Sequence, residues 1–411
     1  MVKMVMTKGS ENSTSTSAER AEYPFIVIWE VTQACDLACL HCRASAQPLR
    51  SPCELSTQEG QDLMRQVRAL NVPVFVLTGG DPLKRPDIDH LVRYGTALGL
   101  RVSLSPSPTP LLTRDALSRL QTAGLARLAI SLDGSTATMH DMFRGVQGSY
   151  DRALQAIRWA HELGLPVQVN STMTRHNFTD FDSLAKLIET LGVVLWSVFF
   201  LVPTGRGKTE DLLSGEEFEQ LFAKLYELSR RVEFDVKTTE AMHYRRYFIQ
   251  RRLQERKDGV QTRAEDKRGP LWLKSSALAG PGSDGIPRAL KGINDAKGFV
   301  FISREGDVYP SGFLPLSGGN IRQKSLAEIY GDSPLFRALR QTANLKGKCG
   351  VCEFREICGG SRARAYALTG DPLAPEPCCI YQPKLWRDQA LTARSSPAGT
   401  LSPSHQVIHQ P

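Results

Sequence analysis

Three cysteines lie close together near the start of the chain, at Cys35, Cys39 and Cys42. Their spacing is C-x3-C-x2-C, and they follow an apolar run, 25–29. Cysteine thiolates are the usual ligands of iron–sulfur clusters. Three thiolates leave one position of a four-ligand site open, whereas a structural zinc site normally closes with four protein ligands. The spacing therefore predicts a metal centre that binds another molecule at its open position.

Two other interpretations of these cysteines are weaker. Free cysteines are often buried as small apolar side chains, but that role does not explain three thiols in one short loop beside the charged Asp36. A zinc site could be completed by His41. His41 lies between two of the cysteines, however, and neighbours in sequence rarely point at the same metal. The open cluster site is the favoured hypothesis.

A second group of residues with possible chemistry is the turn Gly79-Gly80-Asp81, which follows an apolar run. Glycine lets another group approach the backbone closely, and the amides of such a turn can bind an anion. A Gly-Gly turn after a strand is also a common structural feature. On its own, the turn indicates a ligand site only weakly.

A third group lies near the end of the chain, where Cys349, Cys352 and Cys358 are spaced C-x2-C-x5-C. Cys378 and Cys379 follow as a pair and supply a fourth thiolate. Four thiolates suit a structural zinc ion or an iron–sulfur cluster. The residues alone leave both possibilities open.

The segments that must position these residues alternate between strand and helix patterns. Short apolar, β-branched runs predict strands at 25–31, 72–77, 101–104, 126–131, 166–170 and 195–201. Amphipathic segments between them predict helices at 58–70, 88–98, 114–122, 150–163 and 181–191. Ser56, Thr113 and Ser149 are the expected N-caps. Such alternation predicts a parallel sheet with right-handed crossovers, and because six units are too few for a closed eight-stranded barrel, we expect an open partial barrel.

Beyond the sixth strand the pattern changes. Helices are expected at 215–230 and 239–256, and a linker or lid at 257–297, which holds many Gly, Pro, Ser and charged residues. The runs 299–302 and 308–309 flank a turn and predict a hairpin that opens a second module.

The bulk composition excludes some classes of protein. The net charge of +8 comes from 51 basic and 43 acidic residues that are interspersed, which suits a small anionic substrate and does not require nucleic acid. There is no run of about 18 apolar residues that would predict a membrane span and no secretory signal. Nine cysteines without an export signal indicate metal ligation in a reducing compartment. We therefore expect a cytoplasmic protein.

Taken together, the cysteine triplet after a first strand and the Gly-Gly turn after a second resemble the radical S-adenosylmethionine (SAM) superfamily. The resemblance implies that Cys35, Cys39 and Cys42 bind a [4Fe–4S] cluster whose open iron is chelated by SAM, with an electron donor such as ferredoxin or flavodoxin. By position, the residues implied to contact SAM are Gly79, Gly80, Asp81, Ser131, Asp133, Arg144 and Ser171. Asp81 stands where the superfamily usually has Glu.

The later cysteines resemble a SPASM-type extension, which carries auxiliary [4Fe–4S] clusters. Ser311 and Ser361 stand where relatives often have Cys, so the resemblance implies one auxiliary cluster, bound by Cys349, Cys352, Cys358 and Cys379. The expected fold is α/β, a partial (β/α)6 radical SAM barrel followed by a small SPASM-type domain. The expected boundaries are a disordered leader at 1–22, the barrel and its following helices at 23–256, the linker at 257–297, the SPASM-type domain at 298–392 and a flexible tail at 393–411.

The segments 358–366 and 369–374 resemble the branch of these proteins that is related to haem biosynthesis. That branch implies decarboxylation or side-chain removal on an iron porphyrinoid, a polycarboxylated tetrapyrrole. Cationic partners for its carboxylates would be Arg206, Arg245, Arg246, Arg362 and Arg364, and an alternative role of Arg362 and Arg364 is to stabilise the negative charge of the cluster. One alternative is a maturase that modifies a ribosomal peptide. Another is a non-catalytic iron–sulfur carrier, which would have no need of the Gly-Gly turn.

Overall fold

The computed structural model describes residues 23–259, 284–287 and 292–388. Its backbone forms one ten-stranded sheet in the order β10-β9-β8-β1-β2-β3-β4-β5-β6-β7. The first six strands are β1 (Ile26–Glu30), β2 (Val74–Thr78), β3 (Val102–Leu104), β4 (Arg127–Ser131), β5 (Val167–Met173) and β6 (Leu195–Phe200). They pair in parallel with their neighbours in chain order. The predicted open α/β barrel is confirmed.

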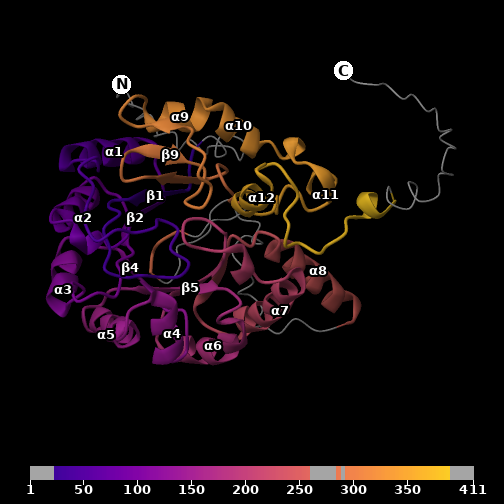
Figure 1. Ribbon diagram of the computed structural model, residues 1–411, viewed down its shortest axis with the longest axis horizontal. Helices are drawn as coiled ribbons and strands as arrows, with labels where there is room; N and C mark the ends of the chain where they lie inside the picture. The colour runs from indigo at the N-terminus through magenta and orange to yellow at the C-terminus, as the bar shows by residue number, and fades with distance from the viewer. Residues whose placement is uncertain (1–22, 260–283, 288–291, 389–411) are drawn as a thin grey trace, which may run out of the picture.

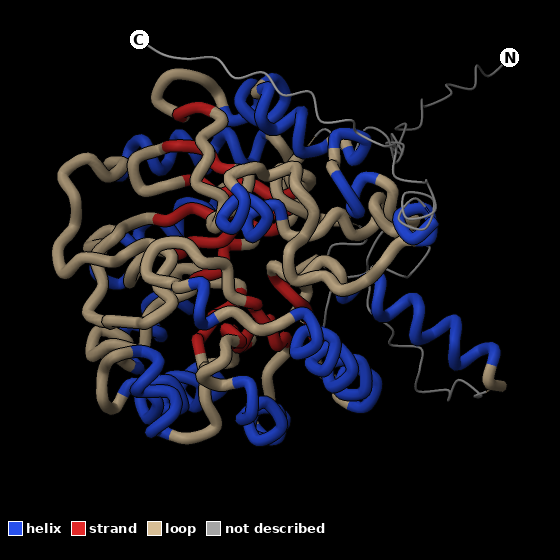
Figure 2. Tube along the Cα trace, turned by 45° about the vertical axis from the view of Figure 1, so that its right-hand side comes forward, coloured by secondary structure: helices blue, strands red, loops and turns tan. Residues whose placement is uncertain are grey.

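Helices connect these strands and cover the outside of the curved sheet (Figures 1 and 2). They are α1 (Thr57–Ala69), α2 (Ile88–Ala97), α3 (Arg114–Thr122), α4 (Ala137–Arg144), α5 (Ser149–Glu162) and α6 (Phe181–Thr190). Ser56 and Thr113 cap their helices as predicted. The expected cap at Ser149 is wrong, because the N-cap of α5 is Gly148 and the Ser149 hydroxyl instead donates to Asp141.

Strand periodicity decides which side chains reach the interior of the barrel. In β1, Val27 and Trp29 are fully buried and belong to the main core, whereas Ile26 and Ile28 line the central cavity. Helix α1 lies so close to Trp29 that a Cβ added at Gly60 would be 2.4 Å from the indole ring. The outer face of the sheet is therefore packed against helices, and the inner face is left for a site.

A seventh strand of the barrel, β7 (Asp235–Thr239), lies between α7 (Gly215–Arg231) and α8 (Tyr244–Lys257) and pairs in parallel with β6. The sequence did not predict it, and the helix expected from Thr239 begins at Tyr244. The reason is that no residue of β7 is fully buried, so the strand shows no apolar alternation.

The C-terminal segment continues the same sheet. Strand β8 (Phe299–Ile302) pairs in parallel with β1 and forms the predicted hairpin with β9 (Asp307–Tyr309), beside which lies β10 (Gly319–Asn320). Helices α9 (Leu326–Asp332), α10 (Pro334–Arg340), α11 (Gly347–Gly350) and α12 (Arg362–Thr369) follow. The hairpin is confirmed, but β8 is also a strand of the barrel wall.

Part of the segment expected to be a linker is packed against the barrel. Ile286 is fully buried with Ile26 and Val74, and Asp284 forms a buried ion pair with Arg127 of β4. Asn294 and Asp295 are also buried. The expected leader and tail, 1–22 and 393–411, lie outside the described residues. Among the residues that are described, no helix is long and apolar enough to cross a membrane.

Candidate active site

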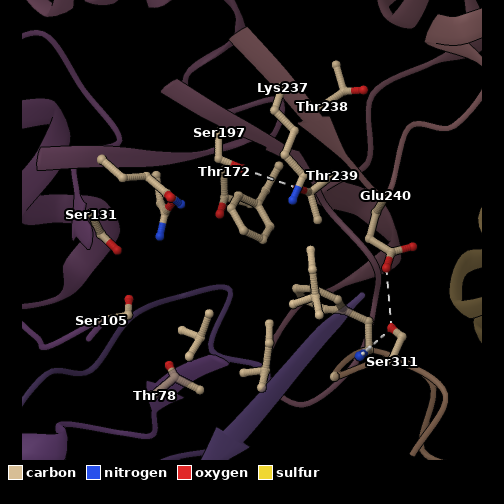
Figure 3. Close-up of a pocket in the computed structure, with 18 of the residues that line it drawn as sticks. Thr78, Ser105, Ser131, Thr172, Ser197, Lys237, Thr238, Thr239, Glu240 and Ser311 are labelled. Carbon is tan, nitrogen blue, oxygen red and sulfur yellow. Dashed lines mark hydrogen bonds between the residues drawn. The ribbon is translucent and has the colours of Figure 1, made fainter. Parts of the chain in front are cut away.

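The inner face of the barrel borders a cavity of about 550 Å³, a volume within the usual range for small-molecule sites. Polar side chains gather at the carboxyl ends of the strands, where open parallel sheets bind ligands. Figure 3 shows them converging on the cavity: Thr78, Ser105, Ser131, Thr172 and Ser197. Apolar side chains line another part of the wall: Ile26, Ile28, Val74, Val76, Phe299 and Phe301.

The structure brings Cys35, Cys39 and Cys42 together at the edge of this cavity. The backbone N–H of Cys35 donates to the carbonyl of Gln47 at 2.8 Å, and the Cys42 carbonyl accepts from the N–H of Arg206 at 2.9 Å. Burial raises the pKa of the Cys35 thiol. The loop is thus held at both ends, and all three cysteines line the same cavity.

The Gly79-Gly80 turn lies directly against the cysteine loop. The N–H of Gly80 donates to the Thr32 carbonyl at 2.8 Å, and that of Asp81 donates to the Ala34 carbonyl at 2.6 Å. A Cβ added at Gly80 would be 2.4 Å from the Ala34 oxygen, so no side chain fits there. Both glycines also line the cavity. Because glycine has no side chain, the turn can pack closely against the cysteine loop and a ligand can also approach the turn from the cavity.

Asp81 is not at the surface of the cavity. Its carboxylate is fully buried and accepts hydrogen bonds from the Thr109 hydroxyl at 2.7 Å and the Leu83 N–H at 3.1 Å. Burial raises its pKa, although these hydrogen bonds oppose the change. The Asp81 carboxylate, expected to contact SAM, does not line the cavity, and it holds the loop at 105–110 against the glycine turn.

Asp133 and Arg144 are expected SAM contacts that instead bind each other. Arg144 Nε donates to Asp133 Oδ2 at 2.7 Å, and the second carboxylate oxygen accepts the N–H of Thr172 at 2.7 Å. Although burial opposes it, the charge of Arg144 lowers the pKa of Asp133. Asp133 lies behind the cavity wall, whereas Arg144 lines the cavity and its Nη1 is 3.6 Å from the sulfur of Cys39. The pair directs one guanidinium toward the cysteine loop.

Ser171, like Asp81 and Asp133, was expected to contact SAM but does not line the cavity. Its hydroxyl donates to the Leu132 carbonyl at 2.5 Å and accepts from the Trp196 indole N–H at 2.9 Å, on the helix-facing side of the sheet. Its neighbours Asn170 and Thr172 line the cavity instead, as does Ser131 of β4. Period-two alternation along β5 was the signal that could have found them.

A smaller cavity lies in the C-terminal segment and is bordered by Cys349, Cys352, Cys358 and Cys379. Burial raises the pKa of Cys352 to about 11 and that of Cys358 to about 12. Backbone N–H groups already point at two of the sulfurs, from Glu376 to Cys349 at 3.3 Å and from Gly360 to Cys358 at 3.4 Å. Within the described residues, no three Cys, His, Asp or Glu side chains converge like the ligands of a single ion.

The two adjacent cysteines at the end of this segment point in different directions. Cys379 borders the small cavity with the other three thiols. Cys378 is buried in the main hydrophobic core, where its sulfur is 4.0 Å from the Leu213 carbonyl. All nine cysteines are free. The four thiols that share one space are those of the expected auxiliary set.

The arginines suggested as substrate partners separate into two groups. Arg362 and Arg364 do not line the large cavity. Arg362 Nη1 donates to the Ala374 carbonyl at 2.7 Å, and Arg364 forms an ion pair with Glu376 at 3.2 Å. Their suggested role is wrong, because both guanidinium groups are buried in protein contacts. Of the five suggested arginines, only Arg245 lines the large cavity. Two cationic side chains that were not suggested, Arg43 and Lys237, also line it.

Two buried carboxylates, Glu240 and Asp295, also line the cavity and were missed by the sequence analysis. Glu240 follows β7 in a left-handed conformation, with φ of 58°, which a residue with a side chain rarely adopts. Its carboxylate accepts from Ser361 at 2.5 Å and from Ser311 at 3.3 Å. Burial and the nearby charge of Asp295 raise the pKa of Glu240 to about 8.

Glu240 therefore makes stability depend on pH. Its pKa is raised above the value of about 4.3 in an unfolded chain. Between about pH 4.3 and about pH 8, the folded protein therefore holds a proton that the unfolded chain has released. The stability due to that proton is lost as pH rises through about 8. We expect the free energy of unfolding to fall between about pH 5 and pH 8, by at most about 1.4 kcal/mol per pH unit, and this contribution to level off above about pH 8. Denaturant unfolding across this range should show a smaller slope for Glu240→Gln, and an unchanged slope would contradict the assignment.

Comparison with known proteins agrees with this geometry. The model of the radical SAM superfamily matches residues 29–190, and that of the SPASM iron–sulfur cluster-binding domain matches 295–353. An AdoMet-dependent heme synthase of Methanosarcina barkeri is 38% identical over 360 residues, which cover 88% of this chain and 97% of that protein. The chain belongs to the radical SAM superfamily. It is a radical SAM enzyme with a SPASM domain, which excludes the non-catalytic carrier.

Other relatives of this radical SAM enzyme have different activities. A pre-heme d1 synthase of Dinoroseobacter shibae is 29% identical, with 86% of this chain and 85% of that protein covered. A mycofactocin maturase of Mycobacterium tuberculosis is 30% identical, with 90% and 86% covered. Streptococcus suis SuiB bound to S-adenosylmethionine has the same fold, with a TM-score of 0.65 at 16% identity over 88% of this chain and 78% of SuiB.

Membership of the superfamily implies a [4Fe–4S] cluster and SAM as cofactors, and the SPASM match implies further iron–sulfur binding. The residues of both cavities fit such groups. The large cavity combines three thiols with polar strand ends, and the small one combines four thiols with backbone donors to two of them.

Proposed function

We propose that this enzyme converts propionate side chains of an iron porphyrin to vinyl groups and thereby produces haem. The observation that carries the proposal is 38% identity to an AdoMet-dependent heme synthase across 97% of that protein's length. Two further AdoMet-dependent heme synthases, from Oleidesulfovibrio alaskensis and Nitratidesulfovibrio vulgaris, are 37% and 38% identical.

The large cavity suits a flat, apolar ring with carboxylate arms. Its apolar wall offers Phe299 and Phe301 to the ring. Arg43, which also pairs with Glu30 at 2.9 Å, stacks over Phe301 at 4.3 Å from the ring centroid, and Arg43 and Lys237 bring positive charge to the wall. Cationic side chains bind carboxylates through charge-assisted hydrogen bonds. These residues would bind and orient the propionates.

The first cluster would be held by Cys35, Cys39 and Cys42. SAM would be contacted by Gly79, Gly80, Ser131, Asn170, Thr172 and Arg144. Behind the cavity wall, these residues would be held in place by Asp81, Asp133 and Ser171. When bound, the cluster and SAM supply a 5′-deoxyadenosyl radical for hydrogen abstraction. Overall, each propionate would lose CO₂, one hydrogen atom and one electron, and would gain a carbon–carbon double bond.

Cys349, Cys352, Cys358 and Cys379 would hold one auxiliary [4Fe–4S] cluster, a candidate acceptor for the electron that each side chain releases. The two cavities are neighbours: Asn294 lines the large one, and its side-chain amide donates to the carbonyl of Cys358 at 3.1 Å. A ferredoxin or flavodoxin is the proposed donor to the first cluster. The proposed SPASM-type domain begins near residue 298 and includes the cysteines beyond residue 353.

The test is an anaerobic assay of reconstituted enzyme with dithionite, SAM and iron-coproporphyrin III. We expect 5′-deoxyadenosine together with haem, detected by chromatography and mass spectrometry. Formation of 5′-deoxyadenosine with an unchanged porphyrin would contradict the proposed substrate. Because a mycofactocin maturase is 30% identical, a matched reaction contains a mycofactocin-type precursor peptide. A modified peptide beside an unchanged porphyrin would favour the peptide maturase.

A further inference from the structure

His243 is a buried polar residue that no step above uses. It lies immediately before α8, is 1% exposed, and borders the small cavity together with the four cysteines. Neither ring nitrogen has a hydrogen-bond partner among the described residues. A buried donor or acceptor that is left unpaired destabilises the folded state. A histidine of this kind at a thiol-lined cavity indicates a hydrogen-bond partner other than the described residues.

The surroundings of His243 leave the cavity as the place for that partner. Its ring stacks on Phe218 with centroids 5.1 Å apart and meets the edge of Phe222 at 4.9 Å. These apolar rings occupy two of its sides. Burial lowers the pKa of His243 to about 3, so the imidazole is neutral and carries one N–H and one lone-pair nitrogen.

We infer that His243 donates its N–H to the auxiliary iron–sulfur cluster and raises the reduction potential of that cluster. The inference rests on the proposed function, in which Cys349, Cys352, Cys358 and Cys379 bind the cluster. Hydrogen bonds to cluster and cysteine sulfurs stabilise the reduced, more negative state. The backbone N–H groups of Glu376 and Gly360 already serve two cysteines, and His243 adds a side-chain donor whose removal leaves the backbone unchanged.

Four cationic groups also lie near this cluster, but each has another contact that fixes it. Arg355 donates to the Gly350 carbonyl at 2.8 Å. Arg246 forms an ion pair with Glu219 and lies 5.1 Å over the ring of Tyr381. The Lys348 ammonium donates to the Cys379 carbonyl, and Arg245 donates to the Ile357 carbonyl at 2.8 Å. Replacing His243 therefore removes a neutral donor and leaves the nearby charges in place, which lets its effect be measured separately.

The experiment uses the full chain with Cys35, Cys39 and Cys42 replaced by Ala, so that only the auxiliary cluster remains. In this background, His243→Phe keeps an aromatic ring between Phe218 and Phe222 but has no N–H, and His243→Asn keeps an N–H donor. A redox titration followed by EPR should give His243→Phe a lower midpoint potential than the parent, with His243→Asn between the two. ENDOR of the reduced cluster should lose an exchangeable-proton coupling in His243→Phe.

The outcomes separate the inference from the function it rests on. Equal midpoint potentials for the parent and His243→Phe would overturn the role of His243 while leaving the auxiliary cluster intact. Loss of the cluster from both His243 variants would also overturn it, because a donor that only tunes the potential is dispensable for assembly. A triple-cysteine parent that holds no cluster would overturn the auxiliary site itself, and the inference with it.

Discussion

Replacing Cys39 by Ala abolishes SAM cleavage, so that 5′-deoxyadenosine stays at the level of a reaction without enzyme. In the proposed site three thiolates bind the cluster, and among the described residues no thiol other than those of Cys35, Cys39 and Cys42 lines the large cavity. Without the cluster, no electron reaches SAM. Chromatography of quenched anaerobic reactions measures the product, and iron analysis should show that the auxiliary iron remains.

The matched control for this variant is Cys53→Ala. Cys53 is exposed and borders neither cavity. It should leave both the iron content and the rate of SAM cleavage unchanged. Full activity of Cys39→Ala would remove the basis for assigning the triplet as cluster ligands.

Replacing Arg364 by Leu lowers the free energy of unfolding by about 3–5 kcal/mol, the usual cost of removing one partner of a buried ion pair. Its guanidinium is completely buried, pairs with Glu376 at 3.2 Å, and donates to the carbonyls of Leu201 at 3.0 Å and Glu240 at 2.7 Å. Although burial opposes it, the charge of Arg364 lowers the pKa of Glu376, so the variant leaves a buried carboxylate without its ion-pair partner. Denaturant unfolding of anaerobically purified protein provides the measurement.

Arg231→Leu is the comparison for Arg364→Leu, because it removes an arginine from an exposed ion pair with Glu189 on the outside of α7. Such surface pairs contribute about 0–1 kcal/mol. If the two variants were equally stable, the arginine network that joins α12 to the ends of β6 and β7 would have no structural importance.

The sequence predicts the parts of this molecule that carry a periodic pattern or a fixed spacing. Strands with apolar alternation and both groups of cysteines belong to this class. Strand β7 does not, because its side chains face a polar cavity and the sheet is held there by backbone pairing to β6. The parallel pairing of β8 with β1 is a contact between distant segments and leaves no local signal.

The polar residues of the cavity were harder to place than the cysteines. Ser171 and Thr172 are neighbours with similar side chains, and a shift of one position along a strand exchanges the two faces of the sheet. Asp133 and Arg144 are 11 positions apart, and nothing in the sequence reveals that they pair with each other. Residue type indicates what a side chain can bind, whereas its partner depends on the tertiary fold.

The position of β8 beside β1 also has a consequence for how the chain is made. Strand β1 leads directly into the cysteine loop, and one of its edges is unpaired until residues 299–302 leave the ribosome. Domains generally fold as units during synthesis, from the N-terminus onward, and an unpaired apolar edge can join other chains. The wall that supports the first cluster is therefore completed late in translation, and polypeptides truncated before residue 299 should aggregate and fail to retain iron at Cys35, Cys39 and Cys42.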